Sequence, residues 1–337
     1  MNKWVGWMAA IVLVFAVLAS GREELQAQAN AKKKPKLFLV AFNEAADKES
    51  GENAVRAGLK KSGLVENVDY ELKIGSAQGD IPTLIQLVDQ AVASGTDVLI
   101  PLQSVSLQAT VERSKGKPVV FHLVSDPVLL GVASTDTDHL PNVTGSYSKI
   151  ESKEIREMLM QLKTSIRGLK KIGTLYVPGE VISMAHKEAL LMQCQELGIE
   201  LKAVPVDTVG DLTNGIQAML GSGIQAVVMV DGSITNGLAA AILKASTNAK
   251  IPVFGFTSLL ARQGAVYCIV PDVGAGGREA GMMVAKILKG ASPKNMPFYR
   301  MPSGFKLVNT PLAKRFGLDM SPETIKGASE VVMPAEQ

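Results

Sequence analysis

The chain has 337 residues, enough for two domains of ordinary size. Hydrophobic residues make up 47% of the sequence and charged residues 20%, a common balance for a globular protein. The formal net charge of +3 is far too small for a nucleic-acid-binding surface, so we expect no nucleic-acid partner.

The N-terminus has the pattern of an export signal. Lys3 precedes an apolar stretch over residues 4–19, which is short for a membrane-spanning helix and suits a signal-peptide core. Small residues farther on predict a signal peptide of residues 1–29, with an earlier cleavage site at 19–21 and an uncleaved anchor as alternatives. Because Gly21 stands where a lipoprotein would have a cysteine, we expect no lipidation. The predicted location is therefore periplasmic or otherwise extracytoplasmic.

The first half of the mature chain alternates strand and helix patterns. Short apolar or alternating runs predict strands at 36–41, 70–74, 97–102 and 118–124. Apolar residues at helical spacing predict helices at 53–61, from Pro82 onward and at 105–114.

The second half repeats this order. Strands are predicted at 171–177, 200–206, 226–230 and 252–256, with helices at 184–197, 211–220 and 235–246. The strand starts pair as 36 with 171, 70 with 200, 97 with 226 and 118 with 252, so the offsets are 135, 130, 129 and 134 residues. A nearly constant offset over four elements indicates a duplicated βαβαβαβ unit.

The join between the two halves is predicted near 142–145. The Ser148 to Glu151 spacing predicts a capping box that opens a helix with its apolar stripe at Ile155, Met158, Leu159 and Leu162. After the last repeated strand, another strand and a helix over about 274–288 are predicted to cross back to the first half.

This alternation predicts an α/β fold with two doubly wound parallel-sheet lobes joined by a hinge. In such sheets, ligands bind beyond the carboxyl ends of the strands. Two adjacent lobes would bring both sets of strand ends to one cleft.

Five segments carry a resemblance to a known family. They are VVFHLVSDPVLLGV (119–132), NVTGSYS (142–148), GTLYVPGEVIS (173–183), IPVFGF (251–256) with GAVYCIVPDVGAGGREAGMMVAKILKG (264–290), and MPFYRMPSGFKLVNTPLAKRFGL (296–318), and the region of Asp231 matches as well. Their order and spacing resemble a type I periplasmic binding protein, and more narrowly the ABC-transporter substrate-binding family associated with tryptophan and tyrosine import. The resemblance covers about residues 35–329.

The resemblance implies a hinge-bending receptor that hands a small solute to an ABC permease in the inner membrane. It implies a first lobe of 35–145 plus 271–298 and a second lobe of 146–270 plus 299–333; we expect a monomer. The chain departs from the family pattern with Val181-Ile182 before Ser183 and with Gly232 after Asp231, where asparagine is common. These departures leave the ligand's side chain open.

Polar residues at the predicted strand ends are the candidate ligand-binding residues. A phenylalanine ring can form an apolar wall of a binding site. Hydroxyl and N–H groups at a helix N-terminus can bind a ligand carboxylate, and an acidic side chain can bind a ligand ammonium group. The competing interpretations are a core phenylalanine, helix or turn caps, and a hinge residue in the case of Asp272. The candidates are Phe42, Asn43, Gln103, Ser104, Ser125, Asp126, Glu180, Ser183, Asp231, Thr257 and Asp272.

If the ligand is a zwitterion, Asp126 or Asp231 is expected to receive its amine and helix N-termini its carboxylate. The predicted function is an extracytoplasmic solute-binding protein that captures an amino acid or a similar solute for an ABC importer. The alternative is an exported ligand sensor of the same fold that acts on a membrane signalling partner.

Motifs for catalysis, cofactors and metals are not found in the sequence. HExxH, GxSxG and GxxxxGK[ST] are absent, and the GAGGRE segment has Glu279 where a dinucleotide-binding fingerprint has its third glycine. We therefore expect no enzyme activity, no cofactor and no metal. Cys194 and Cys268 lie in apolar patterns typical of core residues, and the sequence leaves their pairing open.

Overall fold

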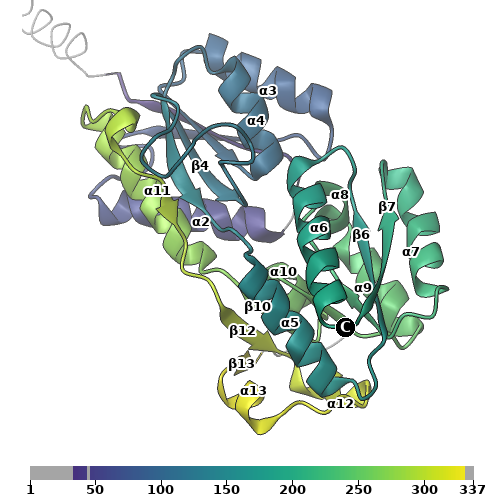
Figure 1. The fold of residues 1–337 in the computed structure, drawn as a ribbon. Helices are drawn as coiled ribbons and strands as arrows, with labels where there is room; N and C mark the ends of the chain where they lie inside the picture. The colour runs from purple at the N-terminus through teal and green to yellow at the C-terminus, as the bar shows by residue number, and fades with distance from the viewer. Residues whose placement is uncertain (1–32, 44–45, 331–337) are drawn as a thin grey trace, which may run out of the picture. The chain divides into compact units, whose positions relative to one another are not determined.

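The computed structural model describes residues 33–43 and 46–330, so the predicted signal peptide of residues 1–29 lies outside the described residues. Residues Met1–Pro35 form a unit of their own, and the fold below is that of Lys36–Gln337. Within it, strands alternate with helices along the chain and form two mainly parallel sheets. This confirms the predicted α/β class with two lobes (Figure 1).

The first sheet is parallel throughout and has the order β2-β1-β3-β4-β5-β11. Its inner strands are buried on both sides, as expected for a parallel sheet covered by helices on both faces. The strands are β1 (Lys36–Ala41), β2 (Glu71–Ser76), β3 (Val98–Leu102), β4 (Val119–Val124), β5 (Val143–Tyr147) and β11 (Tyr299–Arg300).

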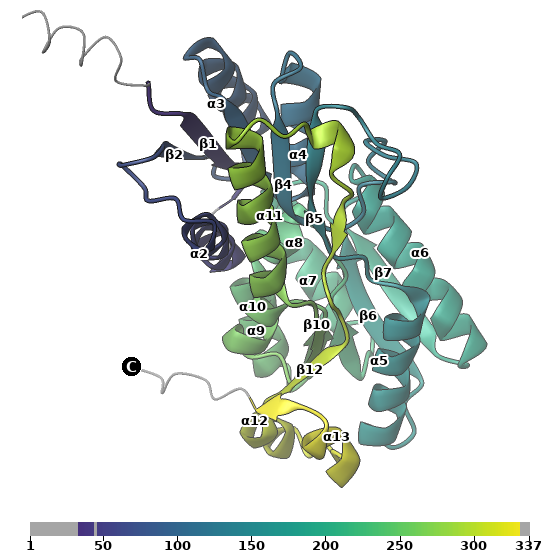
Figure 2. The ribbon, with the colours of Figure 1, turned by 90° about the vertical axis from the view of Figure 1, so that its left-hand side faces the viewer.

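Four helices cover this sheet: α2 (Ala46–Lys61), α3 (Ile81–Ala93), α4 (Ser104–Arg113) and α11 (Val273–Leu288). Alternate residues of β1 divide between the two faces, because Leu37 and Leu39 pack with α2 and α11, whereas Phe38 and Val40 pack with α3 and α4. Helix α11 therefore does cross back to the first lobe, as predicted, and packs across α2 (Figure 2).

The second sheet has the order β7-β6-β8-β9-β10-β12-β13, and only its β10–β12 pair is antiparallel among the pairs described. Its first five strands match the order of the first sheet, which confirms the predicted duplication. They are β6 (Lys171–Tyr176), β7 (Glu200–Pro205), β8 (Ala226–Val228), β9 (Val253–Gly255) and β10 (Tyr267–Val270), followed by β12 (Phe305–Val308) and β13 (Ser329–Glu330).

Two apolar layers enclose the second sheet. One contains the predicted stripe of α5 and residues of α6; the other contains residues of α7, α9 and α10. Cys194 lies in the first layer and Cys268 in the second, so both are buried and unbridged. The helices of this part are α5 (Ser152–Ser165), α6 (Val181–Glu196), α7 (Leu212–Leu220), α8 (Ser233–Gly237), α9 (Ala239–Asn248), α10 (Ser258–Gln263), α12 (Thr310–Arg315) and α13 (Pro322–Lys326).

Two local predictions were wrong. The N-cap of α5 is Glu151, with Glu154 as its capping-box partner, and not Ser148 with Glu151. The N–H of Ser148 donates to the carbonyl oxygen of Val124 at the end of β4, so it is not available for the capping-box bond to the Glu151 side chain. The predicted helix over 235–246 is divided at Leu238 into α8 and α9.

The chain passes between the two sheets at three places: between β5 and α5, between β10 and α11, and between β11 and β12 (Figure 2). The predicted join at 142–145 falls on β5, and the exact lobe boundaries stay a proposal. No helix among the described residues is long and apolar enough to cross a membrane.

Candidate ligand-binding site

A cavity of about 140 Å³ is lined by strand ends of both sheets. The strand order of each sheet reverses beside β1 or β6, and residues that follow β1, β3, β6 and β8 line the cavity. This is the switch point at which doubly wound sheets bind ligands. An apolar cavity of about 150 Å³ is large enough to bind a benzene molecule, so the volume suits a small solute.

Gln103 organises the first-lobe side of the cavity. Its Oε1 accepts hydrogen bonds from the backbone N–H groups of Phe42 (3.1 Å) and Asn43 (3.3 Å), and its Nε2 donates to Asn43 Oδ1 (2.7 Å). Its backbone has a φ of 77°, an uncommon value for a residue with a side chain. The amide therefore ties the end of β1 to the end of β3.

Asp231 follows β8 and receives donors from both lobes. Its Oδ2 accepts a hydrogen bond from the hydroxyl of Ser125, which follows β4, and its Oδ1 accepts one from Asn236 Nδ2 at 2.6 Å. A hydroxyl and an amide are neutral donors, so neither of them supplies a countercharge to Asp231.

Glu180 is the second carboxylate on this side of the cavity. It precedes α6 and accepts hydrogen bonds from the backbone N–H of Ser233 (2.9 Å) and from the Ser233 hydroxyl. Burial raises the pKa of Glu180, and the negative charge of Asp231 adds to the rise, whereas the two bonds from Ser233 oppose it.

Hydrogen bonds between described residues join the lobes directly at the cavity. One runs from Ser125 to Asp231, and another from Asn43 Nδ2 to the carbonyl oxygen of Ser233 at 3.3 Å. These contacts place the strand ends of the two lobes within hydrogen-bonding distance of each other.

Eight of the predicted site residues line the cavity and three do not. Asp126 accepts the N–H groups of Val128 and Leu129 and forms an ion pair with Lys149, with 2.8 Å between Oδ2 and Nζ. The eight predicted residues that line the cavity are Phe42, Asn43, Gln103, Ser104, Ser125, Glu180, Asp231 and Thr257.

Ser183 and Asp272 make local contacts instead. The buried hydroxyl of Ser183 accepts the N–H of Val177 at 2.9 Å, which holds the loop before α6. Asp272 caps α11 by accepting the N–H of Ala275 at 2.8 Å. Ser183 therefore holds the loop before α6, and Asp272 stabilises the N-terminus of α11.

Sequence reasoning missed several lining residues, among them Lys149, Ser233 and Asn236. Ser233 and Asn236 lie two and five residues after Asp231, so the polar segment after β8 carried a signal for them. Lys149 lies between β5 and α5, and β5 is not among the four pairs of strands in the predicted repeat, so that prediction did not point to Lys149.

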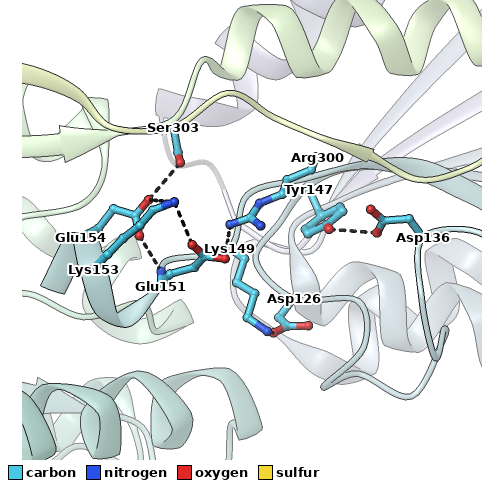
Figure 3. A network of polar contacts seen from close by, with 9 residues as sticks. All are labelled: Asp126, Asp136, Tyr147, Lys149, Glu151, Lys153, Glu154, Arg300 and Ser303. Carbon is cyan, nitrogen blue, oxygen red and sulfur yellow. Dashed lines mark hydrogen bonds and ion pairs between the residues drawn. The ribbon is translucent and has the colours of Figure 1, made fainter.

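A polar network surrounds the crossing segments (Figure 3). Arg300 of β11 forms an ion pair with Glu151 of the second lobe, with 2.6 Å between Nη2 and Oε1. Ser303 donates to Glu154 at 3.1 Å. Hydrogen bonds from Lys153, and then from Arg300, lower the pKa of Glu151. The network joins the segment before α5 to the segment after β11.

The described residues contain no group of three or more His, Cys, Asp or Glu side chains that could hold a metal ion.

Comparison with known proteins identifies the family. The pattern of the family described as ABC transporter substrate binding protein matches residues 39–332. The tyrosine-binding protein of Clostridioides difficile is 22% identical over 298 residues, covering 88% of this chain and 85% of that protein.

Two solved structures share the fold. One, from Streptococcus pneumoniae, is an ABC domain in complex with L-Trp, with a TM-score of 0.83, 19% identity, and coverage of 89% of this chain and 100% of the other. A conserved domain protein of Vibrio cholerae has a TM-score of 0.82 and 23% identity, with the same coverage. Because the family pattern spans most of the sequence, the chain belongs to the ABC transporter substrate-binding protein family.

Proposed function

We propose that this chain captures a small amine-bearing solute, an amino acid or a close relative, between its lobes and delivers it to an ABC permease. The single observation that carries the proposal is the cavity between the strand ends, where Asp231 of one lobe and Ser125 of the other meet. A ligand there touches both lobes, which is what a solute needs in order to stabilise their closed arrangement.

The two ends of an amino acid find complementary groups in the cavity. Asp231 and Glu180 suit its ammonium group, because charge-assisted hydrogen bonds are the strong ones. The N-terminus of α4, at Ser104 and Val105, suits its carboxylate. The Gln103 side chain does not cap that terminus, since its amide bonds with Phe42 and Asn43.

The names of the relatives support an amino acid as ligand. One relative is a tyrosine-binding protein, and one structure of the same fold is a complex with L-Trp. The side chain of the amino acid is left open by the departure from the family pattern at Val181-Ile182, because Ile182 lines the cavity.

The family also supports the place of action. Its substrate-binding proteins work outside the cytoplasm, so we propose that the chain is exported by residues 1–29 and works as a monomer beside its permease. The lobe boundaries given above belong to the same proposal, with the three crossing segments as the hinge.

A ligand panel tests the proposal. The purified protein, without added solute, is screened by thermal shift against the twenty amino acids, then by isothermal titration with those that stabilise it. At 100 times the dissociation constant, binding adds about 2.7 kcal/mol to the unfolding free energy. We expect at least one amino acid to bind with one-to-one stoichiometry. If no amino acid or related amine binds, the proposal is wrong.

A further inference from the structure

Acidic side chains outnumber basic ones among the described residues that line the cavity. Among the described lining residues, Glu154, Glu180 and Asp231 are acids and Lys149 is the one base. Most of the remaining wall is apolar, with Phe42 and Phe256 facing the space from different lobes. The charges that are left after internal pairing therefore decide which ligand charge fits.

Two of the four charges are compensated within the protein. Lys149 forms its ion pair with Asp126, whose side chain is only 3% exposed. Glu154 accepts the hydroxyl of Ser303 and the N–H of Glu151, and its Oε1 lies 3.8 Å from Lys153 Nζ.

The other two charges, on Glu180 and Asp231, have no ion-pair partner among the described residues. The buried His186 interacts electrostatically with Asp231, but burial lowers the pKa of His186 and so favours its neutral form. All of their hydrogen bonds within the described structure come from neutral groups: Ser233 for Glu180, and Ser125 and Asn236 for Asp231. Neither carboxylate takes part in an ion pair with a described residue. Two carboxylates that share a partly buried site repel each other and favour a cation between them.

The pKa of Glu180 agrees with this charge balance. Burial raises it above its usual range, and Asp231 contributes to the rise. A ligand cation would offset both effects, because it restores the countercharge that burial and the second acid make necessary.

We infer that the cavity selects ligands by net positive charge: an organic amine with a compact apolar body binds more tightly than the zwitterion of the same skeleton. This inference rests on the proposed function and names its substrate class. Glu180 and Asp231 together bind the ammonium group, and the apolar walls enclose the body. A ligand carboxylate gains from the N-terminus of α4, but in this inference its repulsion by the two acids outweighs that gain.

Matched ligands test the inference on the unmodified protein. The first set is L-tyrosine, tyramine, which lacks the carboxylate, and 3-(4-hydroxyphenyl)propanoate, which lacks the amine. The second set is L-leucine, isopentylamine and 4-methylpentanoate. By titration calorimetry we expect the amine to bind about tenfold more tightly than the amino acid in the skeleton that fits, and the acid not to bind.

Two variants test the residues. Glu180→Gln and Asp231→Asn keep the shape of each side chain and remove one charge, so each should weaken amine binding by about tenfold or more. The matched controls are Glu188→Gln and Asp207→Asn, which change the same charges at exposed positions of the second lobe and should leave the affinity unchanged. The wild-type ligand comparison stands even where a variant fails to fold.

The two proposals fail in different ways. If an amino acid binds and its amine binds more weakly or not at all, this inference is wrong and the proposed function stands. If an acid that lacks the amine binds as tightly as the amine, the inference is also wrong. If nothing in either set or in the amino-acid panel binds, the proposed function fails and this inference falls with it.

Discussion

Gln103 shows how one side chain fixes the geometry of a binding cavity. Its two amide atoms make three hydrogen bonds to the residues after β1, and the backbone accepts a left-handed φ of 77° to bring them there. Without these bonds, the backbone N–H groups of Phe42 and Asn43 would lose partners at the wall of a partly buried site. We interpret Gln103 as a positioning residue: its Oε1 accepts two hydrogen bonds and its Nε2 donates one, all to the residues after β1.

The sequence located the site residues that follow repeated strands, because parallel strands place their carboxyl ends at one edge. It could not separate ligand-facing acids from capping acids. Asp126 and Asp231 both follow a buried strand, yet Asp126 bonds with Val128 and Leu129 while Asp231 lines the cavity. That difference depends on the turn after each strand, which a single sequence does not specify.

His122 makes folding stability depend on pH. It is fully buried on β4, where burial lowers its pKa from 6.5 to about 3. Below pH 6.5 the unfolded chain binds a proton at this histidine that the folded chain does not. The free energy of unfolding therefore decreases as the pH is lowered, by about 1.4 kcal/mol per pH unit, until the folded pKa is reached. Chemical unfolding between pH 7 and pH 4 measures this slope.

The variant His122→Asn isolates this contribution, because asparagine does not titrate and every other group stays the same. We expect the stability of the variant to fall less steeply with pH than that of the wild type. Parallel curves for the two proteins would show that His122 does not carry the effect.

Helices α2 and α11 approach each other closely because glycines stand at their contact. A Cβ at Gly281 would lie 2.1 Å from the carbonyl oxygen of Val55, and one at Gly58 would lie 2.1 Å from that of Arg278. The glycines therefore bring the two backbones together and fix α11, which arrives from the second lobe, against the first.

The variant Gly281→Ala tests this contact. Because the added methyl group meets backbone, α2 and α11 must separate, and we expect a loss of about 1–3 kcal/mol in unfolding free energy. The matched control is Gly210→Ala, where the nearest atom to an added Cβ is Thr208 Oγ1 at 3.5 Å. Equal thermal unfolding of the two variants would contradict the role of Gly281.

The sequence predicted most of the helices and strands, because apolar runs and helical apolar stripes reflect which residues are buried. It placed the start of α5 wrongly, since Ser148 matched the capping pattern while its backbone still belonged to the end of the first sheet. The start of α2 at Ala46 was also not predicted, because the polar residues before Asn53 have no apolar stripe. Local pattern alone cannot weigh tertiary hydrogen bonds.

For the whole molecule, the duplicated strand order was readable from constant offsets, but the contacts between lobes were not. Ser125 and Asp231 come from strands that are far apart in sequence, and their hydrogen bond depends on how the crossing segments orient the lobes. The Arg300–Glu151 ion pair joins two of those segments and could not be inferred for the same reason.

The variant Ser125→Ala tests whether the direct bond between lobes favours the closed arrangement before a ligand arrives. Removing the hydroxyl leaves Asp231 with one donor fewer, so we expect the ligand-free variant to have a larger radius of gyration in solution scattering. Saturating ligand should restore the wild-type value. Ser94→Ala, in which the hydroxyl bonds only within the first lobe, is the control. Identical scattering of all three ligand-free proteins would contradict this role.

A crystal structure of the protein with the tightest ligand of the panel tests the central claim most directly. The account predicts density for one solute between the strand ends, with its ammonium group against Asp231 and contacts to residues of both sheets. Density at any other place, or contacts to one sheet alone, would contradict it.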